Sequence, residues 1–395
     1  MPCRLRGTIN APSSKSMAHR YLIGAALSGE ACTLTGIDLN EDILASIDCL
    51  TALGADITIN GDTAIINPQE FMKADCSTLN CRESGSTMRF FIPLALCLGK
   101  PITLFGSERL LERPLDVYEE LCQSRGFDFQ KDKKSVTVCG SLKSGKYQIR
   151  GNVSSQFITG LILALVYLGK DSTIEILPPL ESRPYIDLTI SALRSFGACV
   201  SFTDEFKIEI KASKLHAFSG RIEGDYSNAA FLDAFNYIGS EVTIENLKPD
   251  SLQGDRVYAD YFEQISIGTP TLDISDCPDL GPILFALAAL KNGATFTGTD
   301  RLKVKESDRG AAMHEELKKL GGGLIFENNT IIVPKQRLFY RDEPLDGHND
   351  HRIVMAMSVI LSQIGGTIFG AEAIQKSYPG FFEDIKQLGA KVKLT

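Results

Sequence analysis

Residues 49–59 read Cys49-Leu50-Thr51-Ala52-Leu53-Gly54-Ala55-Asp56-Ile57-Thr58-Ile59. The apolar residues before Gly54 fit one face of a helix, and those after it alternate as in a half-buried strand. Gly54 stands where a helix ends in a left-handed residue, a conformation that glycine adopts without steric cost. The stretch therefore predicts a helix, a glycine turn and a strand, the join that characterises an α/β protein.

The same join recurs along the chain. Further copies occur at Leu121–Phe129, Ala192–Val200, Leu317–Gly321 and Ile385–Val392. Their glycines are about 70 residues apart, except for a double interval that leaves room for a shortened copy at Tyr258–Ile265, with Gly268 soon after it. Solenoid repeats run only about 20–50 residues. Six longer units, each with room for two helices and several strands, predict two pseudo-threefold α/β domains that meet near Gly220–Gly224.

Composition argues against a nucleic-acid-binding protein and against a membrane protein. The chain has 395 residues, 44% of them hydrophobic, and a net charge of −8. Nucleic-acid-binding proteins usually present basic surfaces, so nucleic acid is not expected as a partner. No apolar run approaches the roughly 20 residues that cross a bilayer, and no signal-like core follows Met1. We therefore expect a cytoplasmic protein with no membrane partner.

Cysteine and histidine spacing gives no metal motif. The ten cysteines form no CxxC pair, which favours buried, reduced thiols over a zinc site. His348 and His351 with Asp350 could bind a metal, but side chains so spaced in a polar loop more often cap a helix and form ion pairs. We expect no metal.

Polar loops, most of them with Lys or Arg, precede most of the apolar helices. They are Pro12–Arg20, Glu83–Arg89, Glu108–Pro114, Asn152–Phe157, Ser182–Asp187, Asp273–Asp279, Lys303–Arg309, His348–Arg352 and Lys376–Pro379. Free N–H groups at a helix start, with Lys or Arg beside them, suit an anion. Each loop alone could equally be a capped helix with exposed cations. An acidic protein that gathers so many cations at helix starts is expected to bind more than one anionic group.

Two of these loops also offer groups that can transfer protons. In Lys303–Arg309, Ser307 or Asp308 is expected to cap the next helix, which places Glu306 beside any bound anion. In Asp273–Asp279, Asp279 opens an apolar helix and could be a base or simply its N-cap.

Taken in order, the loops resemble those of the 5-enolpyruvylshikimate-3-phosphate synthases (3-phosphoshikimate 1-carboxyvinyltransferases). The matching motifs span residues 12–382. They are Ser14-Lys15-Ser16 with Arg20, Glu83-Ser84-Gly85-Ser86-Thr87-Met88-Arg89, Glu112-Arg113-Pro114, Ser154-Ser155-Gln156, Pro184-Tyr185-Ile186-Asp187, Lys305-Glu306-Ser307-Asp308-Arg309 and Asn349-Asp350-His351-Arg352.

The resemblance implies two inside-out α/β barrel domains, each of three βαβαββ-type units, with the active site in the cleft between them. Residues 13–222 would form the first domain, which mainly binds shikimate 3-phosphate. Residues 1–12 and 223–395 would form the second, with most of the cations that bind phosphoenolpyruvate. The implied state is a monomer without a cofactor or metal.

The implied reaction transfers the enolpyruvyl group of phosphoenolpyruvate to the 5-hydroxyl of shikimate 3-phosphate and releases phosphate. Addition to the double bond protonates C3 while the hydroxyl attacks C2. The tetrahedral product then expels phosphate. Such chemistry needs bound anions and positioned proton carriers rather than a covalent nucleophile. The pathway implied is aromatic amino acid biosynthesis through shikimate.

The resemblance also assigns residues to roles. Lys15, Asp279 and Glu306 would be catalytic. Those implied for shikimate 3-phosphate are Lys15, Ser16, Arg20, Ser154, Ser155, Gln156, Ser182, Tyr185, Asp279 and Lys305. Those implied for phosphoenolpyruvate are Lys15, Gly85, Arg109, Gln156, Arg309, Arg352 and Lys376.

Some positions depart from the family pattern. Arg82 stands where related loops often have glycine, and His19 stands for a more usual asparagine. Two other functions are compatible with the same fold. An enolpyruvyl transferase acting on UDP-N-acetylglucosamine would need a reactive cysteine, but the loop Glu108–Pro114 has none. A non-catalytic anion-binding protein would not need Asp279 and Glu306.

Overall fold

The computed structural model describes residues 4–394. The chain forms two compact units. Ser13–Glu223 make up the first, called here the N-terminal unit, and the residues up to Pro12 together with those from Gly224 onward make up the C-terminal unit. In the described part of the chain, no helix has the length and apolar character needed to cross a membrane.

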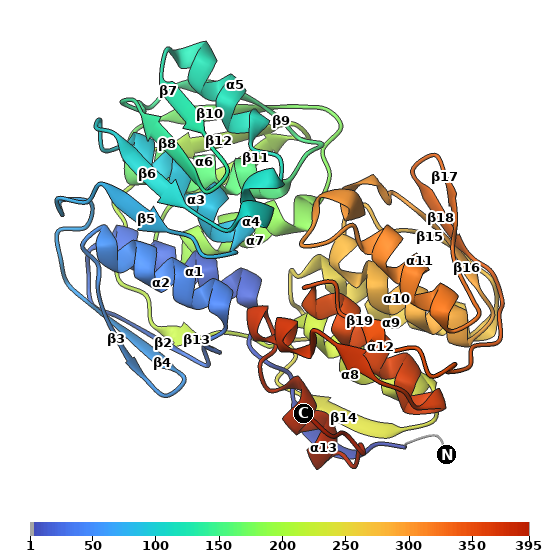
Figure 1. Cartoon of the computed structure of the whole chain (residues 1–395). Coiled ribbons are helices and arrows are strands. Elements are labelled where there is room, and N and C mark those ends of the chain that lie inside the picture. Colours follow the sequence, from blue (N-terminus) through green and yellow to red (C-terminus); the bar gives the residue numbers. More distant parts are fainter. Residues whose placement is uncertain (1–3, 395) are drawn as a thin grey trace. The chain divides into compact units, whose positions relative to one another are not determined.

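The N-terminal unit contains seven helices and twelve strands (Figure 1). Its helices are α1 (Lys15–Ser28), α2 (Glu41–Ala52), α3 (Gly85–Leu96), α4 (Glu108–Glu112), α5 (Asp116–Arg125), α6 (Ser155–Tyr167) and α7 (Arg183–Ser195). Its strands are β2 (Cys32–Thr35), β3 (Asp56–Asn60), β4 (Thr63–Asn67), β5 (Thr78–Asn80), β6 (Ile102–Phe105), β7 (Asp128–Lys131), β8 (Ser135–Cys139), β9 (Lys146–Arg150), β10 (Ser172–Leu177), β11 (Cys199–Asp204), β12 (Lys207–Lys211) and β13 (Gly220–Arg221).

These strands form three four-stranded sheets of one design. Their orders are β13-β2-β4-β3, β5-β6-β8-β7 and β9-β10-β12-β11. In each sheet the first pair is parallel and the other two are antiparallel, as in β5 with β6 and then β6 with β8. Three sheets with the same strand order are the structural form of the sequence repeat.

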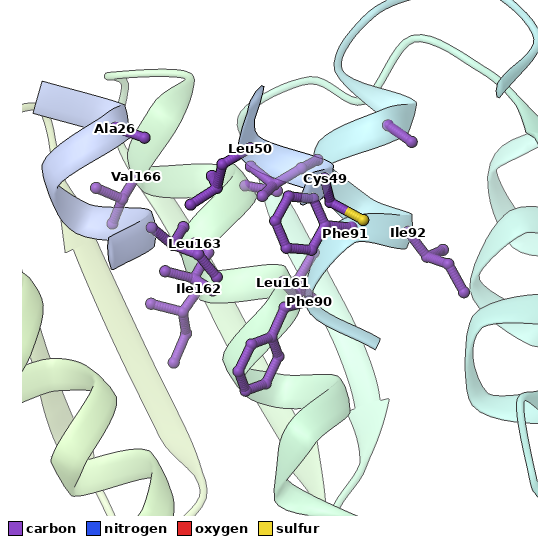
Figure 2. Close-up of a cluster of buried hydrophobic side chains, with 14 of the residues drawn as sticks. Ala26, Cys49, Leu50, Phe90, Phe91, Ile92, Leu161, Ile162, Leu163 and Val166 are labelled. Carbon is purple, nitrogen blue, oxygen red and sulfur yellow. The ribbon is translucent and has the colours of Figure 1, made fainter. Parts of the chain in front are cut away.

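The core of the N-terminal unit consists of helices that are apolar on nearly every face. α3 and α6 bury almost all of their residues, which is expected of a helix without a polar face. Figure 2 shows Phe90 and Phe91 of α3 beside Leu161 and Leu163 of α6 in this core. Helices thus lie in the core of this unit, which is consistent with an inside-out barrel.

The C-terminal unit has the same design with fewer strands. Its helical segments are α8 (Tyr226–Tyr237), η1 (Gly254–Val257), α9 (Tyr258–Ile267), η2 (Pro278–Leu280), α10 (Gly281–Leu290), η3 (Asp300–Val304), α11 (Arg309–Lys319), α12 (His351–Ile364), η4 (Ala371–Lys376) and α13 (Phe381–Gln387). Its strands are β1 (Arg6–Asn10), β14 (Glu241–Glu245), β15 (Thr271–Asp273), β16 (Ala294–Thr297), β17 (Ile325–Glu327), β18 (Thr330–Val333), β19 (Leu345–Asp346) and β20 (Ile368–Phe369).

One full sheet and two short ones complete this unit. The sheet β15-β16-β18-β17 has the same parallel and antiparallel pairs as before, while β1-β14 and β19-β20 are single parallel pairs. α9 leads almost directly into β15, so the fourth repeat lacks its own hairpin, as the shortened copy predicted. α8, α10 and α12 contact one another and carry most of the buried apolar side chains.

The glycines of the repeat behave as the join requires, with one exception. Gly54, Gly126, Gly197, Gly321 and Gly389 all have positive φ, which confirms five left-handed helix ends. Gly268 has φ −161 and is extended, so the shortened copy ends its helix differently. The strand predicted after Gly389 is wrong, because no strand forms in residues 390–394.

Candidate active site

Capped helix starts position most of the predicted site residues. Ser14, Ser84 and Ser154 each accept a hydrogen bond from a backbone N–H in the first turn of α1, α3 and α6. Asp308 caps α11 by accepting from Ala311 N at 3.0 Å, so of the two predicted caps it is Asp308 rather than Ser307. These caps leave Lys15, Gly85, Gln156 and Arg309 on the first turns of their helices.

In the N-terminal unit, α1 presents three of the predicted residues. Lys15 Nζ donates to Asp42 Oδ2 at 2.8 Å in a largely buried pair. The buried guanidinium of Arg20 donates to Ser16 O (2.6 Å), Tyr185 O (2.9 Å) and Thr189 Oγ1 (2.8 Å). Burial lowers the pKa of Arg20 to about 10, which still leaves it charged at neutral pH. Arg20 thus ties the start of α1 to α7.

Gln156 joins the first turn of α6 to that of α3. Its Nε2 donates to Ser86 Oγ at 2.9 Å, and its Oε1 accepts from Arg89 Nη1 at 2.7 Å. The guanidinium of Arg89 lies 5.1 Å from the centre of the Phe157 ring, within reach of a cation–π contact. Gln156 is therefore fixed in orientation before any substrate binds.

Two arginines near α4 differ in their surroundings. Arg113 is 7% exposed, and a Cβ placed on Gly85 would lie 2.6 Å from its Nη1, so any larger residue at position 85 would displace this guanidinium. The side chain of Arg109 is 43% exposed and pairs with Glu112 at 3.2 Å. The structure therefore brings Arg113, and not the predicted Arg109, against Gly85.

The remaining residues predicted in this unit also lie at helix starts. Ser155 is the first residue of α6 and is buried. Ser182 precedes α7 in a left-handed conformation, φ 55, and is fully buried. Tyr185 lies half-buried in the first turn of α7. The structure therefore groups Ser16, Arg20 and Tyr185 through the contacts of Arg20.

In the C-terminal unit, three cations and three carboxylates form a cluster centred on Arg309. We call it the Arg309 cluster, and its members are Asp279, Lys305, Glu306, Arg309, Asp350 and Arg352. Arg309 is 1% exposed and donates to Asp279 (2.8 Å), Glu306 (2.7 Å) and Asp350 (2.9 Å). Asp279 also accepts from Lys305 (3.0 Å) and Arg352 (3.3 Å). These contacts join three loops that are far apart in the sequence.

Asp279 does not cap α10, so that alternative is wrong. It lies in η2, and no side-chain hydrogen bond caps the helix that follows. Burial disfavours its ionised form, but Lys305, Arg352 and Arg309 outweigh this effect and hold the pKa of Asp279 well below its usual value. Burial, opposed by Asp279, lowers the pKa of Lys305 to about 8. Asp279 is thus an anion held by cations.

Arg352 is buried, and only part of its guanidinium is hydrogen-bonded. Its Nη2 donates to Asp279, while Nε and Nη1 have no hydrogen-bond partner in the described part of the chain. The guanidinium lies 5.9 Å from the centre of the Phe231 ring. Leaving buried donors unsatisfied costs about 1–3 kcal/mol per group, more for a charged one. Two donors of a fixed planar fork are therefore available to an anionic ligand.

His348, one of the two histidines considered for a metal, has other partners. His348 Nε2 lies 2.7 Å from Glu316 Oε1, and the hydrogen bond to Glu316 raises the pKa of His348. The carboxylate of Glu316 also accepts from Lys319 Nζ at 2.9 Å, so a cation already occupies this acidic site. Asp350 caps α12 by accepting from Arg352 N. Lys376 Nζ donates to Asn349 O at 2.7 Å, beside the same loop.

The assignment by resemblance left out two residues that organise the site. Asp350 was considered only as a metal ligand or helix cap, yet it also holds Arg309 and accepts from Ser307 Oγ. In the loop Glu108–Pro114 either arginine could clamp an anion, but the resemblance assigned only Arg109, and not Arg113, to phosphoenolpyruvate. Arg113 differs from Arg109 in its contact with Gly85, which lies 28 positions earlier in the sequence. No local sequence pattern predicts that contact.

Comparison with known proteins gives a consistent result. The family model of EPSP synthase (3-phosphoshikimate 1-carboxyvinyltransferase) matches residues 1–385. A 3-phosphoshikimate 1-carboxyvinyltransferase of Clostridium kluyveri is 38% identical over 99% of this chain and 97% of its own length. One of Clostridium perfringens is 35% identical over 99% and 98%, respectively.

Solved structures agree on the fold. Two chains of EPSP synthase from Acinetobacter baumannii superpose with TM-scores of 0.79 and 0.80, at 24% and 22% identity. They cover 98% and 100% of this chain, and 97% and 98% of their own chains are matched. At this level of identity the likeness establishes the α/β fold, and it is consistent with two inside-out barrels.

Proposed function

This chain belongs to the EPSP synthase (3-phosphoshikimate 1-carboxyvinyltransferase) family, and we propose how its residues divide the work of that reaction. The enzyme transfers the enolpyruvyl group of phosphoenolpyruvate to the 5-hydroxyl of shikimate 3-phosphate and releases phosphate, a step of the shikimate pathway. One observation carries the assignment of roles: the buried fork of Arg352 keeps two donors for an anion, directly beside the carboxylate of Asp279.

Phosphoenolpyruvate is assigned to Gly85, Gln156, Arg309, Arg352, Lys376 and Lys15. Forked guanidinium groups match carboxylate and phosphate oxygens in pairs, which supports Arg309 and Arg352 as its main holders. Arg109 was assigned by resemblance. The contact with Gly85 supports Arg113 for the same role, because its guanidinium lies where the backbone of α3 begins.

Shikimate 3-phosphate is assigned to Ser16, Arg20, Ser154, Ser155, Ser182, Tyr185 and Lys305, with Lys15 and Gln156 touching both substrates. Hydroxyls and N–H groups at the starts of α1, α6 and α7 suit a phosphate and a polyhydroxylated ring. Arg20 already bridges α1 and α7, so this part of the site is organised before the substrate arrives.

The proton transfers fall to Asp279, Glu306 and Lys15. Without substrate, the cations of the Arg309 cluster hold Asp279 as a weak base. An anion that binds Arg309 and Arg352 competes for those cations, so the pKa of Asp279 rises toward the range a general base needs. Asp279 then accepts the proton of the attacking hydroxyl. Glu306 and Lys15 are the carriers for protonation at C3.

Two finer points remain proposals. We propose that the enzyme works as a monomer, which sedimentation or light scattering measures directly. We also propose a cytoplasmic location. The cysteines in residues 4–394 are all free thiols, which suits a reducing compartment.

The test is phosphate release from phosphoenolpyruvate, measured with and without shikimate 3-phosphate after treatment with a chelator. The wild-type chain should need both substrates and keep its rate after chelation. A Glu306→Gln variant should lose about 10²–10⁴-fold in turnover while still binding phosphoenolpyruvate. Glu327→Gln is the matched control, because Glu327 is an exposed residue of β17 in the same unit.

Each result has a clear meaning. Equal turnover of Glu306→Gln and Glu327→Gln would remove Glu306 from the proton transfers. No release with shikimate 3-phosphate would contradict the reaction itself, and UDP-N-acetylglucosamine would then be offered as the acceptor.

A further inference from the structure

We propose that a buried hydrogen-bond chain positions the N-terminal end of α3 relative to α1 and α2. Its members are His19, Ser46, Thr87 and Ser84, and we call it the His19–Ser84 chain. The inference rests on the proposed function, because the end of α3 carries Gly85, which is assigned to phosphoenolpyruvate. The four residues are positioning residues, since none is assigned to a substrate.

The chain is continuous and short at every step. His19 Nδ1 lies 2.8 Å from Ser46 Oγ, and Ser46 Oγ lies 2.8 Å from Thr87 Oγ1. Thr87 Oγ1 donates to Ser84 Oγ at 2.8 Å, and Thr87 N donates to the same oxygen at 3.2 Å. His19 is 1% exposed and the other three are fully buried. One polar path thus crosses from α1 through α2 to the cap of α3.

The hydrogens along this path have one consistent direction. Thr87 donates to Ser84, so Thr87 accepts from Ser46, and Ser46 accepts from a protonated Nδ1 of His19. The opposite direction would place the hydrogen on Nε2, which is buried without a hydrogen-bond partner in the described part of the chain. A buried N–H without an acceptor is unfavourable. The geometry therefore selects the Nδ1–H tautomer.

His19 is held neutral where it lies. Burial, then the nearby charges of Lys15 and Arg20, lower the pKa of His19 well below its usual value. The imidazole and the Phe90 ring meet in a T-shaped arrangement, with ring centroids 6.1 Å apart and planes at 90°. A neutral imidazole has one N–H, so the donor in this chain is fixed at ordinary pH.

Apolar packing alone would leave α3 poorly located. α3 contacts α6 through Phe90, Phe91 and their neighbours (Figure 2), and such contacts are not directional. Hydrogen bonds fix distance and orientation, so the His19–Ser84 chain, together with the bonds of Gln156 to Ser86 and Arg89, sets the position of α3 along its axis. The Nη1 atom of Arg113 leaves no space for even a Cβ on Gly85. A small displacement of α3 would therefore disturb this contact.

The test compares Thr87→Val with Thr103→Val by steady-state kinetics and by hydrogen exchange of the Cys81–Phe90 peptide. Thr103 is the control, because its hydroxyl also bonds another threonine of the same unit, Thr137, at 2.9 Å, but on β6 and β8. Thr87→Val should raise KM for phosphoenolpyruvate about tenfold and leave KM for shikimate 3-phosphate within about twofold. It should also speed exchange at the start of α3. Ser46→Ala is the second variant if Thr87→Val does not fold.

A pair of variants at His19 separates positioning from stability. Asparagine can place an N–H near the position of the imidazole Nδ1, whereas leucine fills the space without a donor. His19→Asn should keep KM for phosphoenolpyruvate near the wild-type value, and His19→Leu should raise it as Thr87→Val does. Thermal midpoints of all variants are measured alongside.

The results of these experiments distinguish failure of the inference from failure of the proposed function. Lower thermal midpoints with an unchanged KM for phosphoenolpyruvate would show a purely structural role and overturn the inference. Equal rises in KM for both substrates would also overturn it. A wild-type chain without turnover of the two substrates would instead contradict the proposed function.

Discussion

The buried position of Asp350 gives a sharp test of the Arg309 cluster. Asp350 is fully buried and accepts from Arg309 Nε (2.9 Å), Ser307 Oγ (3.1 Å) and the backbone N of Arg352 (2.9 Å). Asparagine keeps one oxygen for the helix cap but presents an NH₂ group to the donors of Arg309 and Ser307. We therefore predict that Asp350→Asn destabilises the C-terminal unit.

The magnitude follows from what is lost. The helix cap contributes little to the change, because asparagine and aspartate cap equally well. The charge-assisted bond to Arg309 is worth about 1.5–3 kcal/mol. Arg309 retains Asp279 and Glu306, so the full cost of an isolated buried charge, about 3–5 kcal/mol, does not apply. We expect a loss of roughly 2 kcal/mol.

The assay is native-state hydrogen exchange of the α12 peptide, read by mass spectrometry. A chain of two units has no single free energy of unfolding, so a local measurement is preferred. About 2 kcal/mol corresponds to about 30-fold faster exchange through opening of this helix. Asp308→Asn is the matched control, since Asp308 caps α11 in the same unit and its side chain is not part of the Arg309 cluster.

The pH dependence has a defined sign. Burial raises the pKa of Asp350, but Arg309 outweighs this effect and lowers it below the usual value. A carboxyl with a lowered folded pKa contributes stability above its unfolded pKa and loses it as pH falls through the folded pKa. The difference between wild type and Asp350→Asn should therefore be constant from about pH 5 to 8 and shrink below about pH 4. Equal exchange in Asp350→Asn and Asp308→Asn would refute the reasoning.

Two further predictions concern strain and buried charge. Arg82 has φ 50, a conformation that glycine adopts more easily than alanine, so Arg82→Ala should be less stable than Arg82→Gly by about 1 kcal/mol. Glu119, on the exposed face of α5, is the control: there Glu119→Ala should be more stable than Glu119→Gly. Urea unfolding of the four variants checks this, and the same order at both positions would contradict it. Burial, then Asp279, raises the pKa of Asp255 to about 6, so its ionisation reduces stability as pH rises from about 4 to 6. Asp255→Asn should thus stabilise the chain by up to about 3 kcal/mol at pH 7.5 and by almost nothing at pH 4, as urea unfolding at the two pH values measures. If wild type and Asp255→Asn were equally stable at both pH values, ionised Asp255 would not be a source of destabilisation.

The loops that bind anions show where sequence reasoning is reliable. Helix starts at Lys15, Gly85, Ser155 and Arg309 were marked by hydroxyl or carboxylate caps, and the structure has helices beginning there. Caps act on N–H groups two or three residues away, so the signal lies within one short window of sequence.

Contacts between residues far apart in the sequence could not be predicted in this way. Asp279 and Arg352 meet although 73 positions separate them, and nothing near either residue indicates the other. Asp279 before an apolar helix fits a base and a cap equally well. The structure decides against the cap, because three cations surround its carboxylate.

The sequence by itself determined the repeated units, the left-handed glycines that end five of their helices, the α/β class and the loops that gather cations, because these depend on local backbone preferences and on apolar periodicity. Only the tertiary structure decided which cations and carboxylates share a site: that Arg113 rather than Arg109 lies against Gly85, and that Asp350 holds Arg309. Those contacts depend on how helices from distant parts of the chain pack. A local window of sequence carries no information about that packing.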